Sequence, residues 1–86
     1  MKKIITADGF QTLDLKEKTA LIYAFGEELF CRKEKEITVK IFILSDFYVE
    51  VNYGSYNNKI RQIEAITDHY LNENYLSEVD ISDLYN

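Results

Sequence analysis

Proline and tryptophan are absent from this 86-residue sequence, which contains one cysteine, one histidine and three glycines. The lone cysteine, Cys31, excludes an internal disulfide framework, so we expect a reducing, cytoplasmic location. No apolar run approaches the roughly 20 residues that a membrane helix needs, so no membrane partner is expected. The N-terminal segment has two lysines without an apolar stretch behind them, which does not fit a secretory signal.

The common motifs of catalysis and cofactor binding are also missing. There is no glycine-rich phosphate loop, no nucleophile elbow and no CxxC pair. Cys31 falls in a predicted strand, where a buried, inert thiol is the usual case, so a Cys31–His69 dyad is not expected. His69 and Glu73 have the spacing of helical metal ligands, but two ligands do not define a site. We therefore predict no enzyme activity, catalytic residue, cofactor or metal.

Basic residues are missing from the last quarter of the chain. The net charge is −5, and all ten Lys and Arg residues lie within residues 1–61. Within residues 62–86, all of the Asp, Glu, Lys and Arg residues are acidic: Glu64, Asp68, Glu73, Glu78, Asp80 and Asp83. Nucleic-acid affinity depends on neutralising phosphates, so direct binding of DNA or RNA is not expected. The acids form either a solvated helix face or a surface for charge-driven contact with a protein.

An alternating apolar segment, residues 37–53, dominates the middle of the chain. Period-two alternation of β-branched and aromatic residues indicates a hairpin with one buried face. A two-residue turn at Ser45-Asp46 would divide the aliphatic residues of the two strands between both faces. A three- or five-residue connection, with Ile43 opposite Val49, gathers them on one face, and we therefore predict that register.

The predicted register places Lys40, Glu50 and Asn52 on an outer face that is exposed to solvent. It also places three apolar residues on that face, namely Phe42, Leu44 and Tyr48. Either a terminal segment covers these three apolar side chains or a partner does, because exposed apolar patches commonly mark interaction sites. The predicted partner-binding residues are this patch and four acids of the C-terminal quarter: Phe42, Leu44, Tyr48, Glu73, Glu78, Asp80 and Asp83.

A helix is predicted for residues 14–25, with Asp14 as its N-cap and Glu17 completing a capping box. Gly26 is predicted to end it in a left-handed conformation. Before this helix, residues 1–7 are predicted as a short edge strand that ends at an Asp8-Gly9 turn. After it, residues 28–33 are predicted as the first strand of the main sheet.

Residues 59–66 fit two structures. Isoleucines every three residues favour a helix, whereas the short preceding loop and the β-branched content favour a fourth meander strand, which we prefer. A final helix is predicted to begin at Thr67 or Asp68, to run through Ser77, and to dock on the sheet through Tyr70, Leu71 and Tyr75.

Together these elements predict an α+β fold in a single domain, residues 1–86. It is a small antiparallel β-meander of three to four strands, with an N-terminal and a C-terminal helix packed on one face. The leading hypothesis for function is a non-enzymatic protein-interaction module or homodimer. The alternative is an acidic decoy from a phage or mobile element that inhibits a nucleic-acid-binding protein, which the anionic C-terminal quarter suggests.

Four segments carry a resemblance to known proteins: GEELFCRK, ITVKIFILSDFYVEVNY, NKIRQIEAI and YLSEVDISDLY. Together they resemble a group of short, uncharacterised bacterial α+β proteins over about residues 20–85. The shared features are core patterns rather than site motifs. The resemblance implies a bacterial source and assigns no functional residue.

Overall fold

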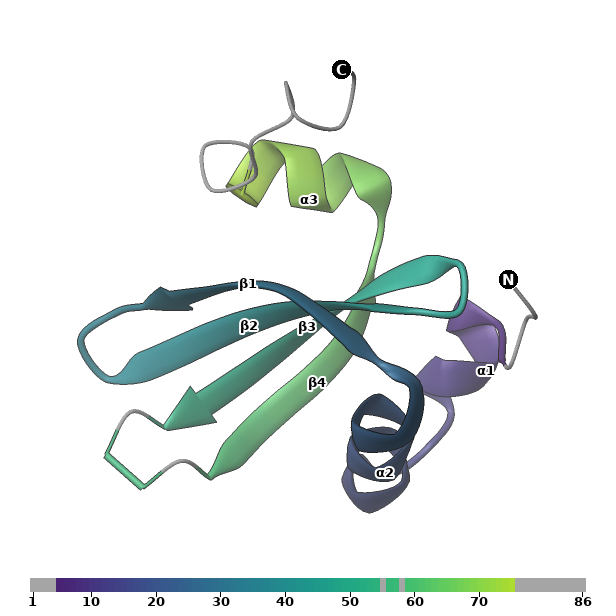
Figure 1. Ribbon diagram of the computed structural model, residues 1–86, viewed down its shortest axis with the longest axis horizontal. Coiled ribbons are helices and arrows are strands. Elements are labelled where there is room, and N and C mark those ends of the chain that lie inside the picture. Colours follow the sequence, from purple (N-terminus) through teal and green to yellow (C-terminus); the bar gives the residue numbers. More distant parts are fainter. Residues whose placement is uncertain (1–4, 55, 58, 76–86) are drawn as a thin grey trace.

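The computed structural model describes residues 5–54, 56–57 and 59–75 (Figure 1). Its elements in chain order are α1 (Ala7–Gln11), α2 (Leu15–Phe25), β1 (Glu27–Lys33), β2 (Ile37–Leu44), β3 (Phe47–Gly54), β4 (Ile60–Ile66) and α3 (Asp68–Tyr75). The four strands form one antiparallel sheet in the order β1-β2-β3-β4. The predicted α+β class and the meander with N- and C-terminal helices are confirmed. None of the helices described is long and apolar enough to cross a membrane.

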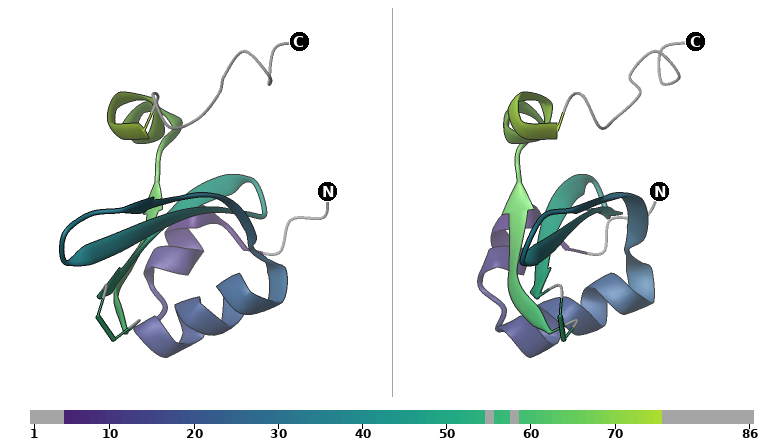
Figure 2. Two further views of the ribbon diagram at one scale, coloured as in Figure 1. Left: turned by 60° about the vertical axis from the view of Figure 1, so that its left-hand side comes forward. Right: turned by 90° about the vertical axis from the view of Figure 1, so that its left-hand side faces the viewer.

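The terminal helices cover opposite faces of the sheet rather than one face. α1 and α2 lie on one side and α3 lies on the other (Figure 2). Phe10 and Ile22 anchor α1 and α2 in a core with Phe42, Leu44, Phe47, Val49, Val51 and Ile63. On the other side, α3 packs Leu71 and Tyr75 against Val39 and Ile41. The sheet is therefore buried on both faces.

The β2–β3 hairpin has the register that the sequence prediction rejected. Ser45 and Asp46 form a two-residue turn, which pairs Leu44 with Phe47 and Phe42 with Val49. Ser45 has a φ of 58°, the positive value that tight hairpin turns need at their first central residue. The predicted three- or five-residue connection is wrong because it assumed a single buried face. With a helix layer on each side, the aliphatic residues serve two cores.

The N-terminal cap of α2 forms as predicted, but its C-terminus does not. Glu17 N donates to Asp14 Oδ1 at 2.8 Å, and Asp14 N donates to Glu17 Oε1 at 3.3 Å. Gly26 is extended, with φ −76° and ψ 150°, because the chain passes directly into β1. A Cβ at Gly26 would lie 2.7 Å from the Ile22 carbonyl oxygen, so this position requires glycine for space rather than for a left-handed conformation.

The Asp8-Gly9 segment lies within α1 instead of forming the predicted turn. Thr6 caps this short helix by accepting a hydrogen bond from Gly9 N at 3.0 Å. Phe10 then enters the core, with its ring centre 5.6 Å from that of Phe47. The described part of the predicted edge strand, residues 5–7, contains no strand, and residues 1–4 lie outside the described residues.

The preferred assignment of residues 59–66 is confirmed. β4 pairs with β3 along its length, for example with Ile63 opposite Val51. Thr67 then caps α3, because its Oγ1 accepts a hydrogen bond from Tyr70 N at 3.0 Å. The predicted continuation of this helix through Ser77 lies outside the described residues.

Candidate functional site

The three apolar residues predicted to bind a partner do not form a surface patch. Phe42 and Leu44 are 8% and 0% exposed and belong to the core beneath α1 and α2. Tyr48 lies on the opposite face of the sheet and packs against the α3 core. The correction follows from the hairpin register, which turns Phe42 and Leu44 toward the first helix layer.

Of the four acids predicted to bind a partner, only Glu73 lies in the described part of the chain. It is exposed on α3, and its Oε1 lies 3.0 Å from His69 Nε2. Glu78, Asp80 and Asp83 lie outside the described residues, so the acidic-decoy hypothesis stays a prediction. The residues described contain no group of three or more His, Cys, Asp or Glu that could hold a metal ion.

Cys31 is exposed on the edge strand β1, which corrects the prediction of a buried thiol. It pairs with Lys40, which in turn pairs with Val51, so its side chain lies on the α1–α2 side of the sheet. His69 is on α3, which covers the other side. The sheet therefore separates this thiol from the imidazole.

A shallow, open recess lies between α2 and the sheet, beside Ile22, Val51 and Ile63, and it has no enclosed space for even a water molecule. Small-molecule sites usually have volumes of about 300–1,000 Å³. This recess is therefore too small to be a small-molecule site.

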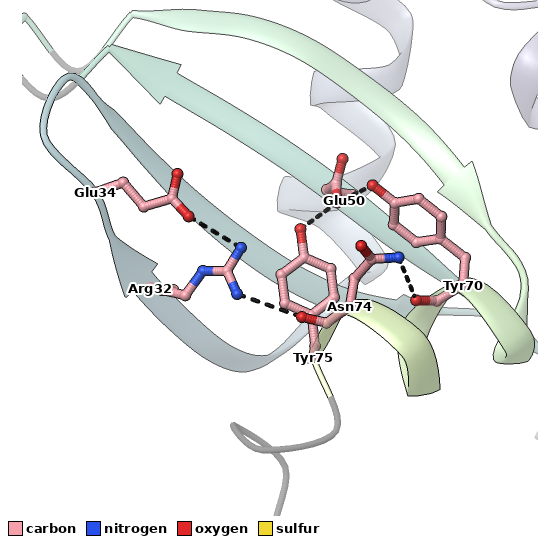
Figure 3. Close-up of polar contacts among 6 residues, drawn as sticks. All are labelled: Arg32, Glu34, Glu50, Tyr70, Asn74 and Tyr75. Atoms are coloured by element: carbon pink, nitrogen blue, oxygen red, sulfur yellow. Dashed lines mark hydrogen bonds and ion pairs between the residues drawn. The ribbon is translucent and has the colours of Figure 1, made fainter.

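A carboxylate buried beneath α3 is the centre of a polar cluster (Figure 3). Glu50 lies on β3 and is 7% exposed. The Tyr70 hydroxyl donates to Glu50 Oε2 at 3.1 Å, and the Tyr75 hydroxyl donates to the same oxygen. The sequence prediction expected both tyrosines to dock on the sheet, but it assigned Glu50 to a wet face. The missed signal was an acid between two valines in a strand facing a tyrosine-bearing helix.

Arg32 of β1 ties the C-terminal end of α3 to the sheet (Figure 3). Its guanidinium lies 4.6 Å from the centre of the Tyr75 ring, within the range of a cation–π contact. Arg32 Nη1 also donates to the Asn74 carbonyl oxygen at 3.4 Å, and Nη2 lies 3.0 Å from Glu34 Oε1. A cation beside the last carbonyls of a helix is favourable. These contacts and the Glu50 cluster hold α3 in place.

Burial raises the pKa of Tyr75, and its hydrogen bond to Glu50 together with the Glu50 charge raises it further. The pKa of Tyr70 is raised by the same causes, burial first. Both tyrosines therefore stay protonated and act as hydrogen-bond donors to the carboxylate. This arrangement fits an attachment for α3 rather than a pair of general bases.

The raised tyrosine pKa predicts a loss of stability in alkali. Unfolded tyrosine titrates near pH 10, so the contribution from Tyr75 is fully present below about pH 10 and is lost as the pH rises further. Above that pH, Tyr75 should lower the free energy of unfolding by about 1.4 kcal/mol for each pH unit. We expect urea unfolding between pH 9 and pH 11, followed by circular dichroism, to show a shallower loss in Tyr75→Phe.

The control for this experiment is Tyr56→Phe, because Tyr56 is 87% exposed. Its alkaline loss should match that of the wild type. A Tyr75→Phe slope equal to the wild-type slope would contradict the hydroxyl–carboxylate attachment.

The outer edge of β4 is covered by side chains from the N-terminal helices. Ala65 N donates to Gln11 Oε1 at 2.8 Å, and Lys18 Nζ donates to the Ile63 carbonyl oxygen at 3.1 Å. These backbone groups point away from β3, so they would otherwise be open to another strand. Capping of this kind protects a sheet edge against strand addition.

Among the residues described, none covers the outer edge of β1 in this way. Leu44 flanks the two-residue turn, so its backbone N–H and C=O bond to β3. The direction of these groups alternates along β2, so those of Val39 and Ile41 point toward β1. Val39 and Ile41 pair with Arg32 and Phe30, which leaves the N–H and C=O of Cys31 and Lys33 directed outward. Within the described chain, no side chain forms a hydrogen bond with these outward groups.

Apolar side chains accompany this open edge. The register shifts between Glu28 and Phe30, which makes Leu29 the extra residue of a β-bulge, and Leu29 is 45% exposed. Phe25, at the end of α2 directly before β1, is exposed as well. The open edge therefore combines backbone hydrogen-bonding groups with apolar surface.

No protein-family model, curated protein or solved structure matches this chain. The resemblance to short bacterial proteins stays a prediction, and the site rests on geometry alone.

Proposed function

We propose that this protein is a non-enzymatic protein-interaction module that binds an extended segment along the outer edge of β1. The observation that carries the proposal is the difference between the two edges of the sheet. Gln11 and Lys18 cap β4, whereas Cys31 and Lys33 direct their backbone groups outward without a side-chain cap in the part described. Binding by strand addition uses such an edge.

The capping of β4 supports this function because it depends on two side chains from distant parts of the sequence. Lys18 and Gln11 reach backbone groups 45 and 54 residues away in the sequence. An uncovered edge is a liability for aggregation, and proteins commonly cover both edges. As far as the described residues extend, one edge is covered and the other is open, which leaves the β1 edge for strand addition.

The open edge also offers contacts beyond the backbone. The outward N–H and C=O groups of Cys31 and Lys33 supply main-chain hydrogen bonds, which give affinity in strand addition. Leu29 adds an exposed apolar side chain next to them. An extended partner would thus gain both kinds of contact along one strand.

A proline at Cys31 should weaken binding without unfolding the sheet. The Cys31 N–H points away from β2, so proline there removes an outward donor but no hydrogen bond of the β1–β2 ladder. Seven-residue extended peptides would be selected on the full chain from a random display library and then titrated by fluorescence anisotropy. We expect Cys31→Pro to weaken binding by about tenfold or more, equivalent to roughly 1.4 kcal/mol.

The matched control is Cys31→Val, which changes the same side chain but keeps the N–H and favours a strand. It should bind the selected peptides as the wild type does. Circular dichroism would verify that both variants are folded. Equal binding by Cys31→Pro, or failure to select any peptide on a chain that is monomeric, would overturn the proposed function.

A further inference from the structure

We infer that the segment bound at this edge is β1 of a second copy of the chain, paired antiparallel across a two-fold axis. This inference rests on the proposed function. The observation behind it is the order of charges along β1. The strand begins with Glu27 and Glu28, continues through three uncharged residues, and ends with Arg32 and Lys33.

Antiparallel self-pairing brings unlike charges together. A two-fold axis at Phe30, the middle residue of β1, places the acidic start of one strand beside the basic end of the other, twice in each dimer. Parallel pairing would instead place Glu27 beside Glu27 and Lys33 beside Lys33 of the two copies. Charged residues on an edge usually oppose strand addition. Here they oppose every arrangement that brings like ends together and favour the antiparallel one.

The outermost charges of β1 are available for this contact. Glu28 already lies 3.3 Å from Lys40, and Arg32 lies 3.0 Å from Glu34, both within the chain. Glu27 and Lys33, by contrast, are exposed, and within the described residues neither has an ion pair in its own chain. They are therefore the natural partners of the opposite charges in a second copy.

The centre of β1 suits a two-fold contact. Leu29 and Cys31 are exposed and would lie close to the axis, where an uncharged middle avoids burying an unpaired charge. Pairing at β1 would join two four-stranded sheets into one sheet of about eight strands, since the order β1-β2-β3-β4 leaves β4 at each far end. Those far ends are the capped edges, so the assembly would stop at two copies.

The test is a pair of charge reversals whose effects should cancel when the two are mixed. Glu27→Lys gives a basic charge at both ends of β1, and Lys33→Glu gives an acidic charge at both ends. Because each substitution occurs twice in a dimer, we expect each to raise the dimer Kd by about tenfold or more at low salt. An equimolar mixture of the two variants should form a heterodimer about as tightly as the wild type forms its homodimer.

Analytical ultracentrifugation would give the Kd values, and native mass spectrometry would separate the heterodimer from the homodimers. Asp8→Lys and Lys16→Glu are the matched controls, because they make the same charge changes on exposed helix positions away from β1. Both controls should dimerise as the wild type does. Raising the salt should shrink the differences among all these proteins, since exposed charges are screened.

Each failure points to a different step. A wild type that stays monomeric while Cys31→Pro still blocks peptide binding would overturn the second-copy inference and leave the proposed function standing. A dimer that survives Cys31→Pro would overturn the second-copy inference, because it would form elsewhere. The proposed function would fall with it only if peptide binding also survived Cys31→Pro. Dimerisation unaffected by either charge reversal, or variants that do not pair when mixed, would overturn the antiparallel arrangement.

Discussion

Truncating Leu44 to alanine should lower the free energy of unfolding by about 2–5 kcal/mol. Leu44 is 0% exposed and belongs to the core with Phe10 and Phe47, so its removal leaves a cavity in addition to the lost burial. Domains of this size have a total stability of about 5–15 kcal/mol, so the loss is a large share of it. Urea unfolding followed by circular dichroism would measure the difference.

The matched control is Leu29→Ala, the same chemical change at a position that is 45% exposed on β1. It should cost less than about 1 kcal/mol, as surface substitutions generally do. The comparison also discriminates between the two hairpin registers, because an odd loop would place Leu44 on the outer face. Equal effects of Leu44→Ala and Leu29→Ala would contradict the two-residue turn at Ser45 and Asp46.

Apart from α1, the elements of this fold could be predicted from the sequence because their signals are local. The capping box of Asp14 and Glu17 marks the start of α2, and alternation marks the strands. The hairpin register could not be predicted in the same way. Whether Phe42 and Leu44 face a core depends on how many faces of the sheet are covered, and α3 covers the second face through tertiary contacts alone.

The candidate site was hidden for similar reasons. The sorted charges of residues 27–33 are visible in the sequence, but they acquire meaning only once β1 is known to be an open edge. The capping of β4 depends on Gln11, which follows the predicted edge strand and turn and had no predicted structure, and on Lys18, whose partner is 45 residues away. Glu50 was assigned to a wet face because its tyrosine partners come from the helix that covers that face.

Removing the Tyr75 hydroxyl should have the second large effect on stability. Glu50 is only 7% exposed, and Tyr75→Phe removes one of the two tyrosine hydroxyls that donate to its carboxylate. Hydrogen bonds to charged groups contribute about 1.5–3 kcal/mol, and that is the loss expected in urea unfolding. Tyr70→Phe should cost less, because the exposed position of Tyr70 lets water reach the vacated side of the carboxylate.

An apolar replacement of the whole cluster separates the hydrogen bonds from the packing. Glu50→Leu alone should destabilise the protein because it leaves the buried Tyr75 hydroxyl without its acceptor. Adding Tyr75→Phe and Tyr70→Phe to Glu50→Leu should recover most of that loss, since removing both partners of a buried polar contact can be nearly neutral. In a double-mutant cycle, Tyr75→Phe should therefore cost much less beside Glu50→Leu than in the wild type. If its cost were the same in both backgrounds, packing of α3 on Val39 and Ile41 would hold that helix without help from the carboxylate.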